Sequence, residues 1–249
     1  MPRFLPSFLR WSFLRIGLRA RHLEREWQVG DGREEALARY VLEHARAGDP
    51  ADAIRVIDEF AYTKSFLINV GDEKGKILDD AVRRAKALRI LELGTYCGYS
   101  ALRMAVAAPE AKIVSIEFNA RNADIARRVF AHAGVQERVQ VVVGTLGDPA
   151  VVDLLATDYF LTEGSLDLIF IDHAKDAYLP DIQTIVARRW LRRGGLAVAD
   201  NVKIPGAPEY RQYMKENQGK RWLTEEHAAH VEYQTLLRDL VLVSELLTP

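Results

Sequence analysis

Cysteine is nearly absent from this chain, whose 249 residues include only Cys97. A single cysteine excludes an internal disulfide, and such scarcity is typical of a reducing compartment. No cysteine and histidine spacing typical of a zinc site is present. We interpret Cys97 as a buried filler in a turn rather than as a nucleophile, since free cysteines pack as small apolar side chains.

An excess of charge of either sign is also lacking. The 34 lysine and arginine residues nearly balance the 35 aspartate and glutamate residues, so the formal net charge is −1. This balance makes no electrostatic case for a nucleic-acid partner, and we expect a small-molecule substrate instead. A hydrophobic content of 49% and a charged content of 28% are typical of a soluble globular protein. We expect a cytoplasmic monomer.

Acidic residues are missing from the start of the chain, where the first is Glu24. Residues 1–30 mix apolar side chains with arginine, in a run too short and too interrupted to span a bilayer or to form a signal peptide. Residues 1–25 could serve as an organelle-targeting peptide or a membrane-surface helix. Because Arg15 and Arg19 fall among the apolar positions of a helical wheel, we favour a docking helix. We expect residues 31–249 to form a single domain.

Apolar runs and helical patterns alternate through the middle of the chain. The expected strands are 89–94, 112–117, 139–143, 167–172 and 195–200, and the helices between them are 99–107, 120–133, 148–157 and 176–188. Continuous apolar runs suit strands buried on both faces, and helical crossovers make such strands parallel. We therefore predict a doubly wound, Rossmann-like α/β sheet that is mostly parallel.

Further elements are expected on both sides of this core. Helices over 34–46, 50–63 and 73–87 precede the first strand and are expected to form an N-terminal cap over the ligand edge of the sheet. After a helix over 208–217, two strands near 221–226 and 237–246 are expected to close the sheet as an antiparallel hairpin.

The stretch from Arg89 to Ser100 reads as a buried strand, a glycine-bearing turn and the start of a helix. Such a corner binds nucleotides in doubly wound sheets. The spacing of Gly94 and Gly98 is G-x-x-x-G, not the G-x-G-x-x-G that holds a pyrophosphate, so a nucleoside without a diphosphate, such as S-adenosylmethionine, is favoured. The next strand ends in Glu117, where a ribose-binding carboxylate belongs. An ordinary β–α turn is the alternative.

Polar side chains follow two neighbouring strands of the predicted sheet. Asp172 follows the fourth strand, and Asp200 and Asn201 follow the fifth. Because adjacent strands lie about 4.8 Å apart, these side chains can converge where ligands bind. Their oxygens suit Mg²⁺, although each residue alone could simply cap a helix or fill a turn. Lys175 can reach the same site, where a cation disfavours its ammonium form, so we predict that it is a general base.

Several motifs together carry a family resemblance. They are Asn-Val-Gly-Asp-Glu-Lys-Gly (69–75), Leu-Glu-Leu-Gly-Thr-Tyr-Cys-Gly-Tyr-Ser (91–100), Asp-His-Ala-Lys-Asp-Ala-Tyr-Leu-Pro-Asp (172–181), Ala-Asp-Asn-Val (199–202) with Pro205-Gly206, and Val-Glu-Tyr (231–233). On these motifs the chain resembles the catechol O-methyltransferases over residues 35–246. The resemblance implies S-adenosylmethionine as methyl donor, a catechol as acceptor and a role in catecholamine metabolism.

The resemblance also implies site residues. Mg²⁺ would be held by Asp172, Asp200 and Asn201, with Lys175 as the base and Glu232 as the anchor of the second catechol hydroxyl. The cofactor would contact Val70, Glu92, Gly94, Tyr96, Ser100, Glu117, Asp172 and His173. The catechol would lie among Phe66, Asp172, Ala174, Lys175, Asn201, Pro205 and Glu232.

The chain departs from the family at several positions. Ala174 stands where the family has tryptophan, Phe66 replaces another aromatic wall, and Lys203 occupies a usually apolar position. Leu146 and Gly147 stand where the family has serine and glutamine near the adenine. The alternatives are a caffeoyl-coenzyme A-type or other small-phenol methyltransferase, a nicotinamide-dependent reductase, and a non-catalytic scaffold that binds S-adenosylmethionine.

Overall fold

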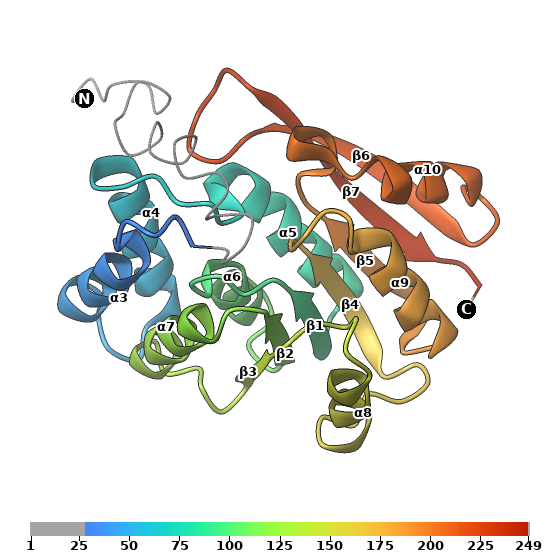
Figure 1. The fold of residues 1–249 in the computed structure, drawn as a ribbon, viewed down its shortest axis with the longest axis horizontal. Coiled ribbons are helices and arrows are strands. Elements are labelled where there is room, and N and C mark those ends of the chain that lie inside the picture. The colour runs from blue at the N-terminus through green and yellow to red at the C-terminus, as the bar shows by residue number, and fades with distance from the viewer. Residues whose placement is uncertain (1–27, 249) are drawn as a thin grey trace.

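A computed structural model describes residues 28–248 (Figure 1). These residues build a seven-stranded sheet in the order β3-β2-β1-β4-β5-β7-β6. Strands β1 to β5 are parallel, and β7 runs antiparallel to both β5 and β6. The strands are β1 Arg89–Leu93, β2 Lys112–Glu117, β3 Val139–Val143, β4 Leu166–Ile171, β5 Leu191–Ala199, β6 Trp222–His230 and β7 Arg238–Leu246. The predicted sheet and its C-terminal hairpin are confirmed.

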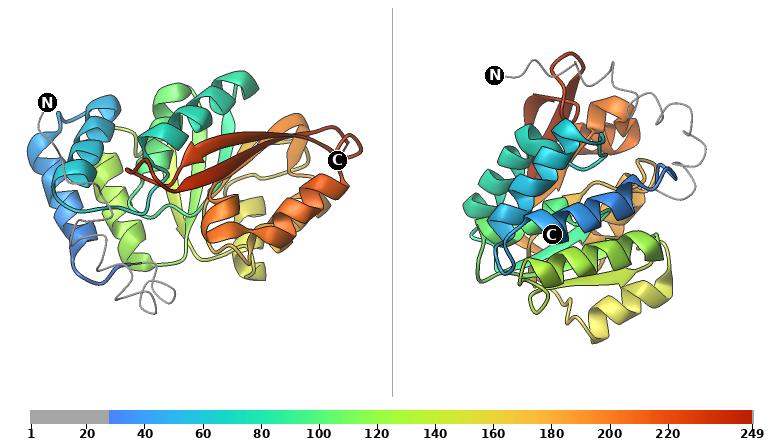
Figure 2. Two further views of the ribbon diagram at one scale, coloured as in Figure 1. Left: turned by 90° about the horizontal axis from the view of Figure 1, so that it is seen from above. Right: turned by 90° about the vertical axis from the view of Figure 1, so that its left-hand side faces the viewer.

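Helices cover both faces of this sheet, as the view from above in Figure 2 shows. One face carries α3 Arg33–His44, α4 Pro50–Thr63, α5 Gly71–Ala85, α6 Tyr99–Ala107 and α7 Ala120–His132. The other carries α8 Pro149–Thr157, α9 Tyr178–Ala187 and α10 Pro208–Glu216, after a π-helical segment, η2, at Val202–Gly206. The described residues therefore form three layers with the sheet in the middle.

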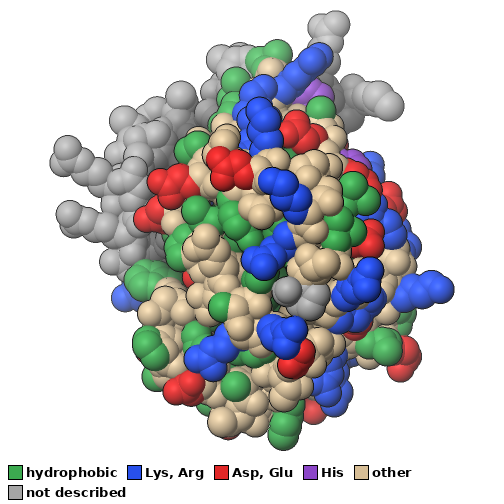
Figure 3. Space-filling view, turned by 90° about the vertical axis from the view of Figure 1, so that its right-hand side faces the viewer, with side chains coloured by type: hydrophobic (Ala, Val, Ile, Leu, Met, Phe, Trp, Pro, Cys, Tyr) green, Lys and Arg blue, Asp and Glu red, His purple; other side chains and the backbone are tan. Residues whose placement is uncertain are grey.

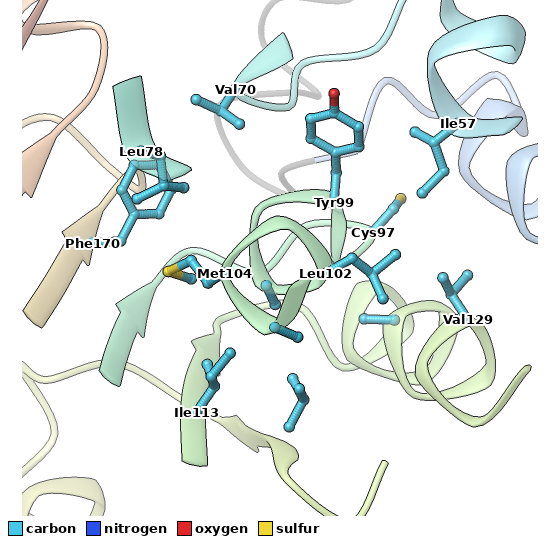
Figure 4. Packing of buried hydrophobic residues seen from close by; sticks show 14 of the residues in the cluster. Ile57, Val70, Leu78, Cys97, Tyr99, Leu102, Met104, Ile113, Val129 and Phe170 are labelled. Atoms are coloured by element: carbon cyan, nitrogen blue, oxygen red, sulfur yellow. The ribbon is translucent and has the colours of Figure 1, made fainter. Parts of the chain in front are cut away.

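The strands supply two separate cores, because side chains alternate across a strand. Phe170 of β4 and Val198 of β5 pack in the core under α3 to α7, whereas Ile171 and Ala199 pack in the core under α8 to α10. Figure 4 shows Leu102 of α6 within the first of these cores. The same alternation directs the next residues, Asp172 and Asp200, toward the face that carries α5.

Helix starts and strand lengths show where local patterns were sufficient. Asn119 and Asp148 cap α7 and α8 by accepting backbone hydrogen bonds, and both helices begin within two residues of their predicted starts. α5 begins at Gly71, two residues before the predicted start, and the N–H of Gly71 donates to Oδ1 of Asn69. β6 extends well beyond the predicted 221–226, since an edge strand exposed to solvent carries a polar pattern that resembles a loop.

The three helices before β1 extend the layer on one face, and parts of them reach the ligand edge. α5 packs on the sheet beside α6, while α3 and α4 pack on α7 and α6. At the edge, Arg33 donates to the carbonyl of Phe66 at 2.5 Å, and the Tyr96 hydroxyl donates to Glu34 at 3.1 Å. The N-terminal cap thus reaches the ligand edge through the first residues of α3 and through the segment between α4 and α5.

The surface over the C-terminal half mixes charges of both signs. Figure 3 shows lysine and arginine side chains interspersed with acidic and apolar ones on one face. Among residues 28–248, no helix combines the length and the apolar character that a membrane crossing requires. The predictions for residues 1–25 concern a segment outside the described residues.

Candidate active site

The residue after β1 must be glycine, because the backbone that follows β4 lies close to it. Gly94 has φ +99°, and a Cβ atom there would lie 2.6 Å from the carbonyl oxygen of Asp172. Gly98 has φ +88°, and a Cβ there would lie 2.5 Å from the ring of Phe130. Both positions therefore need glycine for protein packing alone, and the turn between them carries Tyr96 at a φ of 48°.

The carboxylate of Glu117 is fixed beside this turn. Its Oε2 accepts from the backbone N–H of Tyr96 at 2.7 Å, and its Oε1 accepts from that of Asn119 at 2.8 Å. Glu117 is only 4% exposed, and burial raises the pKa of its carboxyl group. Nδ2 of Asn122 also donates to Oε1 at 3.4 Å, so of the four or so acceptor positions of a carboxylate Glu117 keeps limited capacity for ligand hydroxyls.

Glu92 forms a second buried polar group close to the turn. Its two oxygens accept hydrogen bonds from Ser100 and Ser115. Glu92 has no solvent exposure, and burial raises the pKa of its carboxyl group to about 7. The structure thus brings together two predicted cofactor residues, Glu92 and Ser100.

Two more predicted cofactor residues lie on either side of this region. Val70 is buried immediately before α5. His173 follows β4, and its Nε2 lies 2.8 Å from Asp181 while its ring stacks on Tyr178. His173 Nδ1 is buried and has no hydrogen-bond partner among the described residues. A polar atom in that condition is suited to a ligand.

Lysine and acidic side chains meet where β4 and β5 end and where the antiparallel strand β7 begins. Nζ of Lys74, from α5, lies 2.8 Å from Asp200, 2.5 Å from Glu232 and 3.1 Å from Asp239. Lys74 is 1% exposed. Burial opposes its charge, but the surrounding carboxylates outweigh burial and raise its pKa. We call Asp172, Asp200, Glu232 and Asp239 the acidic cluster.

Lys175 lies on the other side of this cluster. Its Nζ is 3.1 Å from Oδ1 of Asp172 and 2.5 Å from the hydroxyl of Tyr178. That hydroxyl donates in turn to the backbone carbonyl of Asp200 at 2.9 Å. The predicted base is therefore held by residues that follow β4 and is tied to the end of β5.

Asn201 completes the group. Its side-chain Nδ2 donates to Oε1 of Glu232 at 3.0 Å and to Oδ2 of Asp239 at 2.7 Å. Its backbone N–H donates to Oδ1 of Asp200 at 2.7 Å. The predicted metal residues thus lie in one hydrogen-bonded network with the predicted substrate anchor, Glu232.

The chemistry of this network suits a divalent cation. The four carboxylates of the acidic cluster outnumber the ammonium groups of Lys74 and Lys175 by two, so the fully ionised network carries a charge of −2. Burial raises the pKa of Asp172, and it raises the pKa of Asp200 to about 7, so a bound cation would stabilise the ionised form of both carboxyl groups. Within residues 28–248 no three histidine, cysteine, aspartate or glutamate side chains are grouped as metal ligands. The predicted set uses two carboxylates and one amide, which water and substrate oxygens would complete.

The predicted acceptor walls lie around the same edge. Phe66 is buried, with its ring edge-on to Tyr233 at 6.3 Å between centroids. Ala174 is half-buried between Asp172 and Lys175, and Pro205 is exposed on η2. Phe66 is thereby adjacent to the residue that follows the predicted anchor, Glu232.

Three residues of the site were missed by sequence reasoning. Lys74 belongs to the 69–75 motif and lies one helical turn before the buried Leu78, on the same face of α5. That spacing could have indicated that its charge is buried. Asp239 opens the apolar run of β7, where a charged residue is equally unusual. Tyr178 carried no comparable signal, because tyrosine is ordinary at a helix start.

Open hollows elsewhere on the molecule lack this chemistry. One of about 440 Å³ lies beside Tyr40 and Lys64, and another of about 520 Å³ lies between Glu35 and Arg128. Both flank α3, and neither is lined by any predicted site residue. The polar network at the strand ends is therefore the candidate active site.

Comparisons with known proteins agree with this geometry. A family model described as O-methyltransferase matches residues 51–221. A probable O-methyltransferase of Mycobacterium tuberculosis is 56% identical over 227 residues, which is 91% of this chain and 97% of that protein. The catechol O-methyltransferase of Bos taurus is 38% identical over 85% of this chain and 76% of its own length.

A solved structure supports the fold separately. The O-methyltransferase of Bacillus cereus, solved in complex with SAH, superimposes with a TM-score of 0.60 at 21% identity, covering 85% of this chain and 97% of the other. At that identity the likeness is one of fold, a mixed sheet between helical layers.

Proposed function

The chain belongs to the O-methyltransferase family, and from this premise we propose that it transfers a methyl group from S-adenosylmethionine to one hydroxyl of a catechol in a Mg²⁺-dependent reaction. The observation that carries the proposal is the network of Asp172, Lys175, Asp200, Asn201 and Glu232. It joins hard oxygen donors and an amine at the ligand edge, next to the glycine turn. The similarity to catechol O-methyltransferases supports the same substrate class.

The protein's own groups would divide the work. Asp172, Asp200 and Asn201 would hold Mg²⁺, whose chemistry when bound is Lewis-acid polarisation and orientation of the two catechol oxygens. Nζ of Lys175, which lies 3.1 Å from Oδ1 of Asp172, would take the proton of the reacting hydroxyl. The carboxylate of Glu232 would accept a hydrogen bond from the other hydroxyl and so orient the ring.

Cofactor recognition would rest on the turn after β1. Glu117 is already anchored by two backbone N–H groups, and its remaining acceptor capacity suits ribose hydroxyls. Glu92 and Ser100, which are hydrogen-bonded to each other, would provide further polar groups next to this turn. Val70 and His173 would close the nucleoside site from α5 and β4.

Replacing Glu117 tests this cofactor assignment. Glu117→Ala leaves two ribose hydroxyls without a charged acceptor, which costs roughly 1.5–3 kcal/mol. We expect calorimetry to show S-adenosylmethionine affinity lowered by about 10-fold to 150-fold. Asp124→Ala, on the exposed surface of α7, is the control and should bind as the wild type does. Equal affinity in both variants would remove Glu117 from the site.

An acceptor larger than catechol, such as a caffeoyl-coenzyme A-type phenol, is the second candidate. The observation that favours it is Ala174, whose methyl group stands where the resembled family has a tryptophan wall. Beside Asp172 and Lys175, this small residue leaves that side of the acceptor site more open, so bulky substituents meet less overlap.

Ala174→Trp tests whether this position lines the acceptor site. Some 40–60 Å² of added ring contact is worth about 1 kcal/mol at about 25 cal/mol per Å². We expect the KM for small catechols to fall about fivefold and turnover of bulky catechols to decline. Gln183→Trp adds the same ring to an exposed position of α9 and serves as control. Unchanged KM and product isomer ratio in Ala174→Trp would exclude position 174 from the pocket.

An acceptor panel tests the proposed function itself. The enzyme is incubated with S-adenosylmethionine and Mg²⁺ plus a catechol, a phenol with a single hydroxyl, or caffeoyl-coenzyme A, and products are identified by mass spectrometry. We expect methylated catechol and very little product from the single-hydroxyl phenol, because only vicinal oxygens chelate a metal. Equal turnover of the catechol and of the single-hydroxyl phenol would contradict the proposal.

A further inference from the structure

We infer that Asp239 is a positioning residue that orients the side-chain amide of Asn201, so that the carbonyl oxygen rather than the NH₂ group faces the metal site. The inference rests on the proposed function, since it assigns a task within that site. It starts from the position of Asp239 at the beginning of β7, where the residue as a whole is 2% exposed. A carboxylate so deeply buried needs partners for both oxygens.

The partners of Asp239 come from three separate elements. Oδ1 accepts from the backbone N–H of Ile204 in η2 at 3.0 Å. Oδ2 accepts from Nδ2 of Asn201 at 2.7 Å and from Nζ of Lys74 in α5 at 3.1 Å. Asp239 therefore ties η2, the end of β5 and α5 together at the ligand edge.

The orientation of the Asn201 amide follows from what its neighbours can accept. Its two side-chain partners, Glu232 and Asp239, are carboxylates that accept hydrogen bonds and donate none when ionised. The NH₂ group must therefore face them, and the planar amide directs Oδ1 away from them. No described residue donates a hydrogen bond to Oδ1, so this oxygen is available to a cation.

Asp239 is better suited than Glu232 to hold this orientation during the reaction. Glu232 is 10% exposed and is the proposed anchor of a substrate hydroxyl, so its hydrogen bonds change when substrate binds. Asp239 has no exposed side-chain surface, and its partners all belong to the protein. The backbone of Asn201 adds to the constraint, because φ is 52° and its N–H is bonded to Asp200.

The central variant is Asp239→Asn, which keeps the shape and removes one acceptor oxygen. The new amide can serve Ile204, or it can serve Asn201 and Lys74, but not both groups. Residues that orient metal ligands typically contribute 10-fold to 100-fold to metal affinity. We expect Mg²⁺ affinity, measured by calorimetry with S-adenosylmethionine bound, to fall by about that factor while affinity for S-adenosylmethionine itself is unchanged.

A matched control separates orientation from general loss of a carboxylate that accepts several hydrogen bonds. Asp167 accepts from the backbone N–H groups of Leu88 and Arg89 and from Arg192. It lies near the amino end of β4, at the opposite edge of the sheet from the site. Asp167→Asn should therefore lower thermal stability without changing Mg²⁺ affinity.

A double-mutant cycle tests the orientation directly. A carboxylate at position 201 presents oxygen on both sides and needs no orienting partner, so Asn201→Asp should make the site insensitive to Asp239→Asn. We expect Asp239→Asn to change Mg²⁺ affinity by less than about threefold in the Asn201→Asp background. If the Asp239→Asn single variant does not fold, Asn201→Asp is compared with Asn201→Asp/Asp239→Asn. A change in Mg²⁺ affinity of less than about threefold between these two supports the inference, and a larger loss overturns it.

The outcomes distinguish the inference from the proposed function. If the wild type binds no Mg²⁺, the metal part of the proposed function fails. If the wild type binds Mg²⁺ and Asp239→Asn binds it equally well, the positioning role is overturned. An equal loss in both backgrounds also overturns it, because Asp239 would then act through its charge alone.

Discussion

Asp200→Ala is expected to eliminate methyl transfer to catechol while S-adenosylmethionine still binds. Asp200 has no solvent exposure, and its Oδ2 lies 2.8 Å from Nζ of Lys74. Loss of a metal's Lewis-acid contribution costs several kcal/mol of transition-state stabilisation, so turnover should fall roughly 10³-fold or more. Product is measured by mass spectrometry, and donor binding is measured by calorimetry.

The fold should tolerate this replacement. Lys74 keeps Glu232 and Asp239 as partners at 2.5 and 3.1 Å, so its buried charge stays paired. Asp167→Ala, at the opposite edge of the sheet, is the matched control and should retain turnover. Near-normal catechol turnover in Asp200→Ala would remove this residue from the metal site.

Lys175→Met is the second large effect expected. Methionine keeps the side-chain stem and removes the amine that lies 3.1 Å from Asp172. We expect kcat to fall by about 10²-fold to 10⁴-fold at neutral pH, the usual contribution of a general base. The affinity for S-adenosylmethionine should change little, because among the predicted cofactor residues Lys175 contacts only Asp172 and neither Glu92 nor Glu117.

The pH profile of this variant provides a readout that a structural role would not affect. The kcat deficit should shrink as pH rises, since the catechol hydroxyl then ionises without help from the protein. Lys215→Met, on the exposed surface of α10, should behave as the wild type does at every pH. A kcat for Lys175→Met that equals the wild-type value at neutral pH would exclude Lys175 as the base.

Much of this site could be predicted because it lies on regular strands. The two-residue alternation of β4 and β5 sends Asp172 and Asp200 to the same face, and parallel pairing brings the ends of these strands together. The position of Glu117 follows from the same argument, because it ends β2, which pairs in parallel with β1. No long-range information was needed for these residues beyond the order of the strands.

Lys74 and Asp239 could not be assigned in this way. Their roles depend on α5 packing over the ends of β5 and β7, which neither helical periodicity nor strand alternation specifies. The length of β6 was also underestimated, because its polar residues face solvent at the sheet edge. Sequence patterns thus placed the proposed metal residues more completely than the groups that contact them.

Metal dependence of product formation tests the central claim most directly. The protein is incubated with S-adenosylmethionine and a catechol in EDTA, then with Mg²⁺ added in excess of the chelator, and the methylated product is quantified by mass spectrometry. The account predicts no product in EDTA and its return with Mg²⁺. Full turnover in EDTA would contradict it.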